Sequence, residues 1–151
     1  MSVPVVAPRP SGVPVTTVSA LVIISALVVG VGLASNTVLH HLVQTLPLWA
    51  AAAAGRKPAA QWFALPCFVF WLGIMAAIWL FLLHLPSFVN GHFSPVEIAM
   101  TILVGIAALV AIPATPFRGV SPGTAAAGFL LGAVAQFAAF RLSLIPVIWN
   151  H

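Results

Sequence analysis

The chain has 151 residues, of which 62% are hydrophobic and 4% are charged, and its formal net charge is +4. A soluble domain carries about 25% charged residues, so this chain has too few charges to cover a water-facing surface. The composition therefore predicts an integral membrane protein in contact with lipid, and the few basic residues exclude a nucleic-acid-binding surface.

The chain begins with a proline-rich segment that is followed by an apolar run. Residues 1–16 contain four prolines, which predict an extended tail. Residues 17–34 are an apolar run long enough to cross a hydrocarbon core about 30 Å thick. An alternative stays open here, because Gly32-Leu33-Ala34 has the small-residue pattern of a cleavage site and residues 1–34 would then be a signal peptide.

Residues 36–54 show the periodicity of an amphipathic helix. The apolar positions with helical spacing are Leu39, Leu42, Val43, Leu46 and Ala50. The opposite face is polar and carries His40, His41, Gln44 and Thr45. This pattern predicts an interfacial helix between the first two membrane spans. His40 and His41 point about 100° apart on a helix, so they cannot bind one ion together, although either one has the chemistry of an axial haem ligand.

Three further apolar runs predict three more spans, at about 62–85, 95–112 and 124–145. The predicted fold is therefore an all-α bundle of about four transmembrane helices, and residues 17–151 form one helical domain. An even number of spans puts both termini on one side of the membrane. The basic residues are divided between the sides, with Arg56, Lys57 and Arg118 on one and Arg9 and Arg141 on the other. The positive-inside rule then favours termini outside a bacterial inner (plasma) membrane.

The loop before the third span contains side chains that could cap a helix, bind a metal ion or form an ion pair. Ser94 and Glu97 have the spacing of a capping box around Pro95, which predicts the start of the third helix there. His84, His92 and Glu97 offer a low-ranked alternative as metal ligands, but their spacing matches no metal motif. Glu97 is also placed to form an ion pair with Arg141 between the third and fourth spans. We expect no metal and no cofactor from these patterns.

Small residues mark the helix faces that we expect to pack closely. Gly128 and Gly132 form a G-x-x-x-G pattern in the fourth span, and Gly30 and Gly73 lie in similar small-residue stripes of the first and second spans. Glycines at this spacing let helix backbones approach each other in a membrane. The partner helix is not specified by the pattern.

No catalytic set is visible in the sequence. The chain has no Asp and no Tyr, Glu97 is its only carboxylate side chain, and Cys67 is its only cysteine. An acid–base pair therefore cannot be built from carboxylates. The expected function is that of a non-catalytic accessory or structural subunit, which contacts the lipid bilayer and other membrane subunits or associates with itself. The alternatives are a small oligomeric transporter or channel, and a haem- or quinone-binding membrane redox protein.

Overall fold

The computed structural model describes residues 13–89, 91–116 and 120–149. These residues form helices and no strand, so the predicted all-helical class is confirmed for the described part of the chain. The first twelve residues of the proline-rich tail lie outside the described residues, and so do Arg9 and Arg118.

Four helices are long and apolar enough to cross a membrane. They are Val15–Ser35, Pro58–Leu82 (α5), Pro95–Ala114 (α6) and Pro122–Ser143 (α7). The first of them consists of α1 (Val15–Ser25), a π-helical segment η1 (Ala26–Val31) and α2 (Gly32–Ser35). These bounds agree with the predicted spans to within four residues. A short helix, α8 (Pro146–Trp149), follows the last span.

The end of α5 lies before the predicted residue 85 because the backbone turns at His84. His84 adopts a left-handed conformation with φ 58°. Its N–H donates to the carbonyl oxygen of Phe81 at 3.0 Å, and the N–H of Leu85 donates to that of Leu80 at 2.9 Å. These two hydrogen bonds are a Schellman motif, which satisfies carbonyl groups at a helix C-terminus.

The starts of α6 and α7 are fixed by side-chain caps. At α6 the Ser94 hydroxyl accepts from the Glu97 N–H at 3.3 Å, and the Glu97 carboxylate accepts from the Ser94 N–H at 2.7 Å. This is the capping box read from the sequence. At α7 the Ser121 hydroxyl accepts from the Thr124 N–H at 3.1 Å. Local sequence therefore decides where both helices begin.

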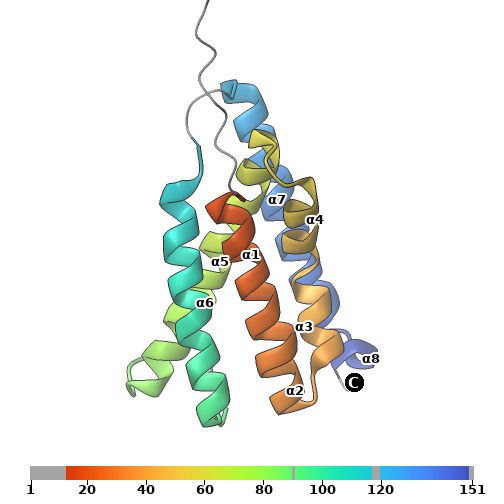
Figure 1. The fold of residues 1–151 in the computed structure, drawn as a ribbon. Coiled ribbons are helices and arrows are strands. Elements are labelled where there is room, and N and C mark those ends of the chain that lie inside the picture. The colour runs from red at the N-terminus through yellow and green to blue at the C-terminus, as the bar shows by residue number, and fades with distance from the viewer. Residues whose placement is uncertain (1–12, 90, 117–119, 150–151) are drawn as a thin grey trace, which may run out of the picture.

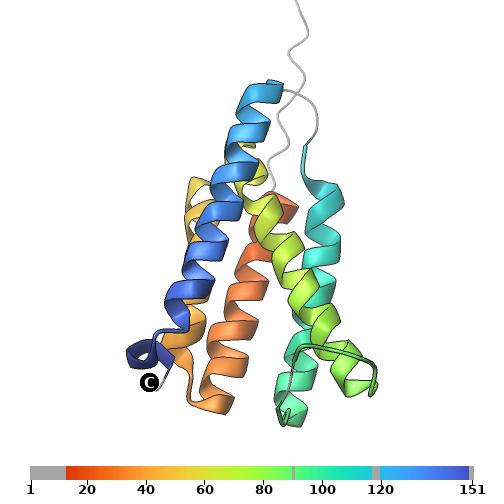
Figure 2. The ribbon, with the colours of Figure 1, turned by 180° about the vertical axis from the view of Figure 1, so that it is seen from behind.

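Residues 38–54 run lengthwise through the bundle as α3 (Val38–Gln44) and α4 (Leu46–Ala54). At one end, α3 begins beside the last turn of α7. At the other end, Thr16 near the start of α1 and Gly55 after α4 line one small cavity. The described residues thus pass along the bundle five times, as α1 to α2, α3 with α4, α5, α6 and α7. The start of α1 and the end of α7 lie at opposite ends of the bundle (Figures 1 and 2). The sequence analysis placed those two ends on the same side because it left this segment at the interface.

The polar face of α3 is directed into the bundle. His40, Gln44 and Thr45 are at most 5% exposed, whereas Leu39, Leu42 and Leu46 are 39–49% exposed. The predicted amphipathic periodicity is therefore present, but its two faces are arranged opposite to those of a helix on a soluble protein. Lipid accounts for this arrangement, because apolar side chains are at no disadvantage on a hydrocarbon-facing surface and polar groups need partners inside the protein.

Close helix contacts occur at three of the four predicted glycines. A Cβ on Gly132 would overlap the Phe63 carbonyl oxygen of α5. A Cβ on Gly128 would lie 3.1 Å from another backbone oxygen of α5. At Gly30 a Cβ would meet the Met100 sulfur of α6 at 2.5 Å. Gly73 differs from the prediction, because a Cβ there would have no neighbouring heavy atom within 4 Å.

Candidate functional site

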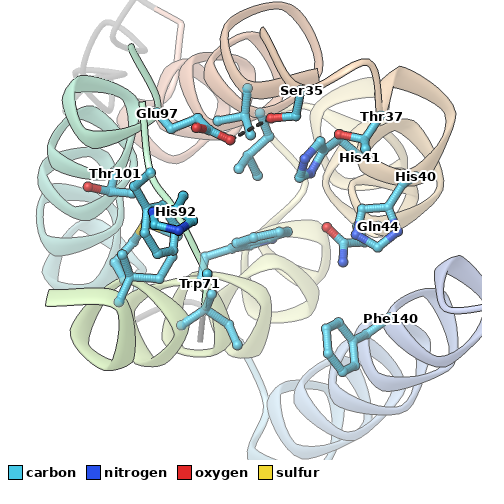
Figure 3. A pocket seen from close by; sticks show the side chains of 17 residues that line it. Ser35, Thr37, His40, His41, Gln44, Trp71, His92, Glu97, Thr101 and Phe140 are labelled. Atoms are coloured by element: carbon cyan, nitrogen blue, oxygen red, sulfur yellow. Dashed lines mark hydrogen bonds between the residues drawn. The ribbon is translucent and has the colours of Figure 1, made fainter. Parts of the chain in front are cut away.

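A cavity of about 370 Å³ lies inside the bundle, at the end that holds the α2–α3 turn and the α5–α6 loop (Figure 3). Its walls come from η1 and α2, α3, α5, α6, α7 and residues 91–93 of the loop. The chain order explains this convergence, because each lengthwise pass contributes one turn of helix to the same level of the bundle. A cavity of this volume falls within the range of small-molecule sites.

The cavity does not continue through the described bundle. One helical turn beyond the lining residues lie Ile23, Leu48, Phe68 and Val104, all of which are 0% exposed. These side chains belong to the apolar core that fills the middle of the bundle. The space is therefore a pocket within the described part of a single chain, and it does not form a pore.

Polar residues of α3 join the pocket wall to α7. The Nδ1 atom of His40 donates to the carbonyl oxygen of Ser143 at 2.9 Å. The Gln136 side-chain amide donates to the main-chain oxygen of Gln44 at 3.1 Å. Both bonds are buried and connect segments more than 90 residues apart in the sequence. They hold α3 in the orientation that turns His41 toward the pocket (Figure 3).

Glu97 joins α6 to α2 at the rim of this pocket. Besides its capping role, its carboxylate accepts a hydrogen bond from the Ser35 hydroxyl at 2.5 Å. Its side chain and that of His41 both line the pocket (Figure 3). The predicted ion pair with Arg141 is wrong, because α6 and α7 lie on opposite sides of the bundle (Figure 1). The hydrogen-bond donors to Glu97 come from Ser35 and Ser94.

Three buried polar atoms at the pocket have no hydrogen-bond partner among the described residues. They are the indole Nε1 of Trp71, the hydroxyl of Thr37 and the Nδ1 of His41. An indole N–H can only donate, and a hydroxyl can also donate. Buried polar groups in proteins are normally paired with protein, water or ligand, so these three atoms are candidates for ligand contacts.

The predicted metal ligands do not form a metal site in the described part of the chain. His84 is at the exposed end of α5, whereas His92 and Glu97 both line the pocket. Among the described residues there is no group of three or more His, Cys, Asp or Glu side chains that could hold a metal ion. The sequence analysis placed His40 and His41 on an interfacial helix between the first two spans, whereas in the structure both of them line the same pocket as His92.

The sequence analysis considered His41 only as an axial haem ligand, and it missed Ser35, Thr37 and Trp71 as site residues. Ser35 and Thr37 flank the turn at Asn36, a short polar interruption between two apolar stretches. That interruption was the available signal, since polar residues at a span boundary gather where helices end. Trp71 gave no signal, because it resembles the other aromatic residues of its span.

Comparisons with protein-family models, with curated proteins and with solved structures found no match for this chain. The functional argument therefore depends on the pocket itself.

Proposed function

We propose that this protein is a membrane-embedded binding protein that holds a small, mainly apolar molecule in the pocket between α2, α3, α5 and α6. The observation that carries the proposal is the indole N–H of Trp71, which is buried without a partner at a cavity of about 370 Å³. A concave, mostly apolar space with a few polar groups is typical of small-molecule sites. A carboxylate pair for acid–base catalysis cannot be built, because Glu97 is the only carboxylate side chain of the sequence, and this fits binding better than catalysis of that kind.

We further propose that α3 and α4 together are a fifth membrane crossing. Residues 38–54 reach about 25 Å at a rise of 1.5 Å per residue, which is close to the hydrocarbon thickness of a bilayer. Their outward face carries Leu39, Leu42 and Leu46, and their polar side chains bond within the bundle. Both features suit a segment surrounded by lipid better than one lying at the interface.

The charge distribution supports one orientation for this five-pass arrangement. Arg56 and Lys57 lie between α4 and α5, at the end of the bundle where α1 begins. Arg141 is the basic residue near the pocket end. The positive-inside rule then favours a cytoplasmic start of α1 and a pocket that faces the outside. In this proposed orientation the end of α7 lies outside, as in the sequence analysis, whereas the start of α1 lies in the cytoplasm and not outside.

The proposed binding function is tested by filling the pocket with a larger side chain. Val31 lines the pocket, and Val29 in the same π-helical segment is 58% exposed on the outer surface. We expect wild type and Val29→Phe, purified in mild detergent, to retain a small molecule that Val31→Phe lacks. Organic extracts of the three proteins, compared by mass spectrometry, give the result. Identical extracts from all three proteins would contradict the proposal.

The accessory-subunit function remains a prediction from composition. It is compatible with a bound small molecule, because the outer faces of α6 and α7 are apolar and suit lipid or another membrane helix equally well. The alternative of a small oligomeric transporter or channel requires a polar lumen formed by several copies of the chain, and it also remains a prediction from the sequence.

A further inference from the structure

We propose that the molecule held in the pocket is a neutral ring compound with carbonyl oxygens, of the quinone type, and that Trp71 donates a hydrogen bond to it. This inference rests on the proposed binding function and names the chemical class of the ligand. It comes from the hydrogen-bonding capacity of the pocket, the charge at its rim and the apolar character of its walls.

The hydrogen-bonding capacity requires an acceptor. Trp71 is 3% exposed, and Figure 3 shows its ring extending into the space enclosed by the helices. An indole has one N–H donor and no acceptor, so only an acceptor atom can satisfy it. A carbonyl oxygen of a ligand is such an atom and introduces no charge into the pocket.

Two further polar groups that can donate lie on the other side of the space, a hydroxyl and an imidazole nitrogen that donates in its N–H tautomer. Thr37 and His41 belong to the α2–α3 turn and α3, whereas Trp71 belongs to α5 (Figure 3). The Thr37 hydroxyl and the Nδ1 of His41 also have no partner among the described residues. Donors on two facing walls suit a ring that carries acceptor oxygens on opposite edges, which is the arrangement of a para-quinone.

The charge at the rim disfavours ionic ligands. Glu97 places a carboxylate at the pocket, and this charge repels carboxylate or phosphate head groups. Its oxygens already accept hydrogen bonds from Ser35 and Ser94. A cationic ligand whose polar groups are N–H donors would leave the Trp71 N–H without an acceptor. A neutral acceptor is the class that meets both conditions.

The remaining wall suits a flat apolar ring. Leu27, Ile74, Met75 and Phe140 line the space together with the indole of Trp71. Aromatic and thioether side chains make favourable contacts with ring faces and edges. The ring would therefore lie among apolar side chains while its oxygens contact the donors.

The test compares three probes of similar ring size on purified protein in detergent. They are 2-methyl-1,4-naphthoquinone, 2-methylnaphthalene, which lacks the oxygens, and 2-naphthoate, which is an anion. Saturable binding of each radiolabelled probe is measured on wild type, Val31→Phe and Val29→Phe. We expect the quinone to bind about tenfold more tightly than the other two probes, and only Val31→Phe to reduce that binding.

The donor is tested with Trp71→Phe, which keeps an aromatic ring and removes the N–H. Trp79 on the same helix does not belong to the residues that line the pocket, so Trp79→Phe is the matched control. Trp71→Phe should weaken quinone binding about three- to tenfold and leave 2-methylnaphthalene binding unchanged. The unchanged methylnaphthalene binding also shows that the variant is folded.

The outcomes separate the ligand class from the binding function. If Val31→Phe reduces the binding of every probe, but the quinone has no advantage over 2-methylnaphthalene, the pocket binds small molecules and the inferred class is wrong. If Trp71→Phe weakens quinone and methylnaphthalene equally, the inferred hydrogen bond is wrong. If Val31→Phe changes the binding of none of the probes, both the binding function and the ligand class fail.

Discussion

The Nδ1 atom of His40 donates to the main-chain carbonyl oxygen of Ser143 at 2.9 Å, which ties the first turn of α3 to the last turn of α7. His40 is 4% exposed, so this bond is made inside the bundle. It holds α3 against α7, and α3 thereby forms one wall of the pocket. The stability of this wall should depend on the donor at position 40.

Replacing His40 tests that dependence. His40→Leu removes the donor, and we expect a loss of about 1 kcal/mol in the free energy of unfolding. His40→Asn keeps a donor near the position of Nδ1 and should lose less. Unfolding in mixed detergent micelles, followed by circular dichroism, measures both variants. Wild-type stability in His40→Leu would mean that the bond to Ser143 contributes nothing.

The five-pass arrangement predicts the sides from which single cysteines react. In a Cys67→Ala background, Asn36→Cys should react with membrane-impermeant thiol reagents from outside, and Ala54→Cys should react from the cytoplasm. Both positions are exposed and flank the α3–α4 segment. Leu85→Cys in the loop after α5 should behave like Asn36→Cys. If Asn36 and Ala54 react from the same side, α3 and α4 do not cross the membrane.

The glycine contacts predict opposite effects for two Gly→Ala substitutions. At Gly132 a Cβ overlaps the backbone of α5, so Gly132→Ala should separate the helices and destabilise the protein by about 1–3 kcal/mol. At Gly73 the space is open, and Gly73→Ala should be neutral or stabilising by up to about 1 kcal/mol. Unfolding midpoints of the two variants give the comparison. Equal midpoints would show that α5 and α7 do not pack through Gly132.

The two roles of Glu97 can be separated by variants of its partners. Ser94→Ala removes the cap and should cost about 1 kcal/mol. Ser35→Ala removes the link between α2 and α6 without touching the cap. Ser35 and Ser94 donate to different oxygens of Glu97, and Glu97→Gln keeps one of these two acceptors, so it should be milder than Glu97→Ala, which removes both. Unfolding midpoints rank the four variants.

The same measurement tests the absence of an ion pair. Because α7, which contains Arg141, lies on the opposite side of the bundle from α6, which contains Glu97, the effects of Arg141→Gln and Glu97→Gln should add in the double variant. A coupling energy above about 0.5 kcal/mol would indicate an interaction between the two residues and would contradict this arrangement.

The sequence by itself determined the all-helical class, the four long apolar helices and the residues at which α6 and α7 begin. These features depend on neighbours in the chain, as with Ser94 and Glu97, which are three residues apart and cap the same helix. It also determined the periodicity of residues 38–54. Interactions of this range are encoded by spacing and can be recognised without knowing the fold.

Only the tertiary structure decided which way the polar face of α3 points and which distant residues meet at the pocket. The spacing of His40 and Gln44 is the same whether their side chains face water or the interior of a bundle, so periodicity could not distinguish the two. Ser35 and Glu97 are 62 residues apart, and no local pattern pairs them. The packing of α3 beside α7 settles both questions, because buried polar groups in lipid must find partners within the protein.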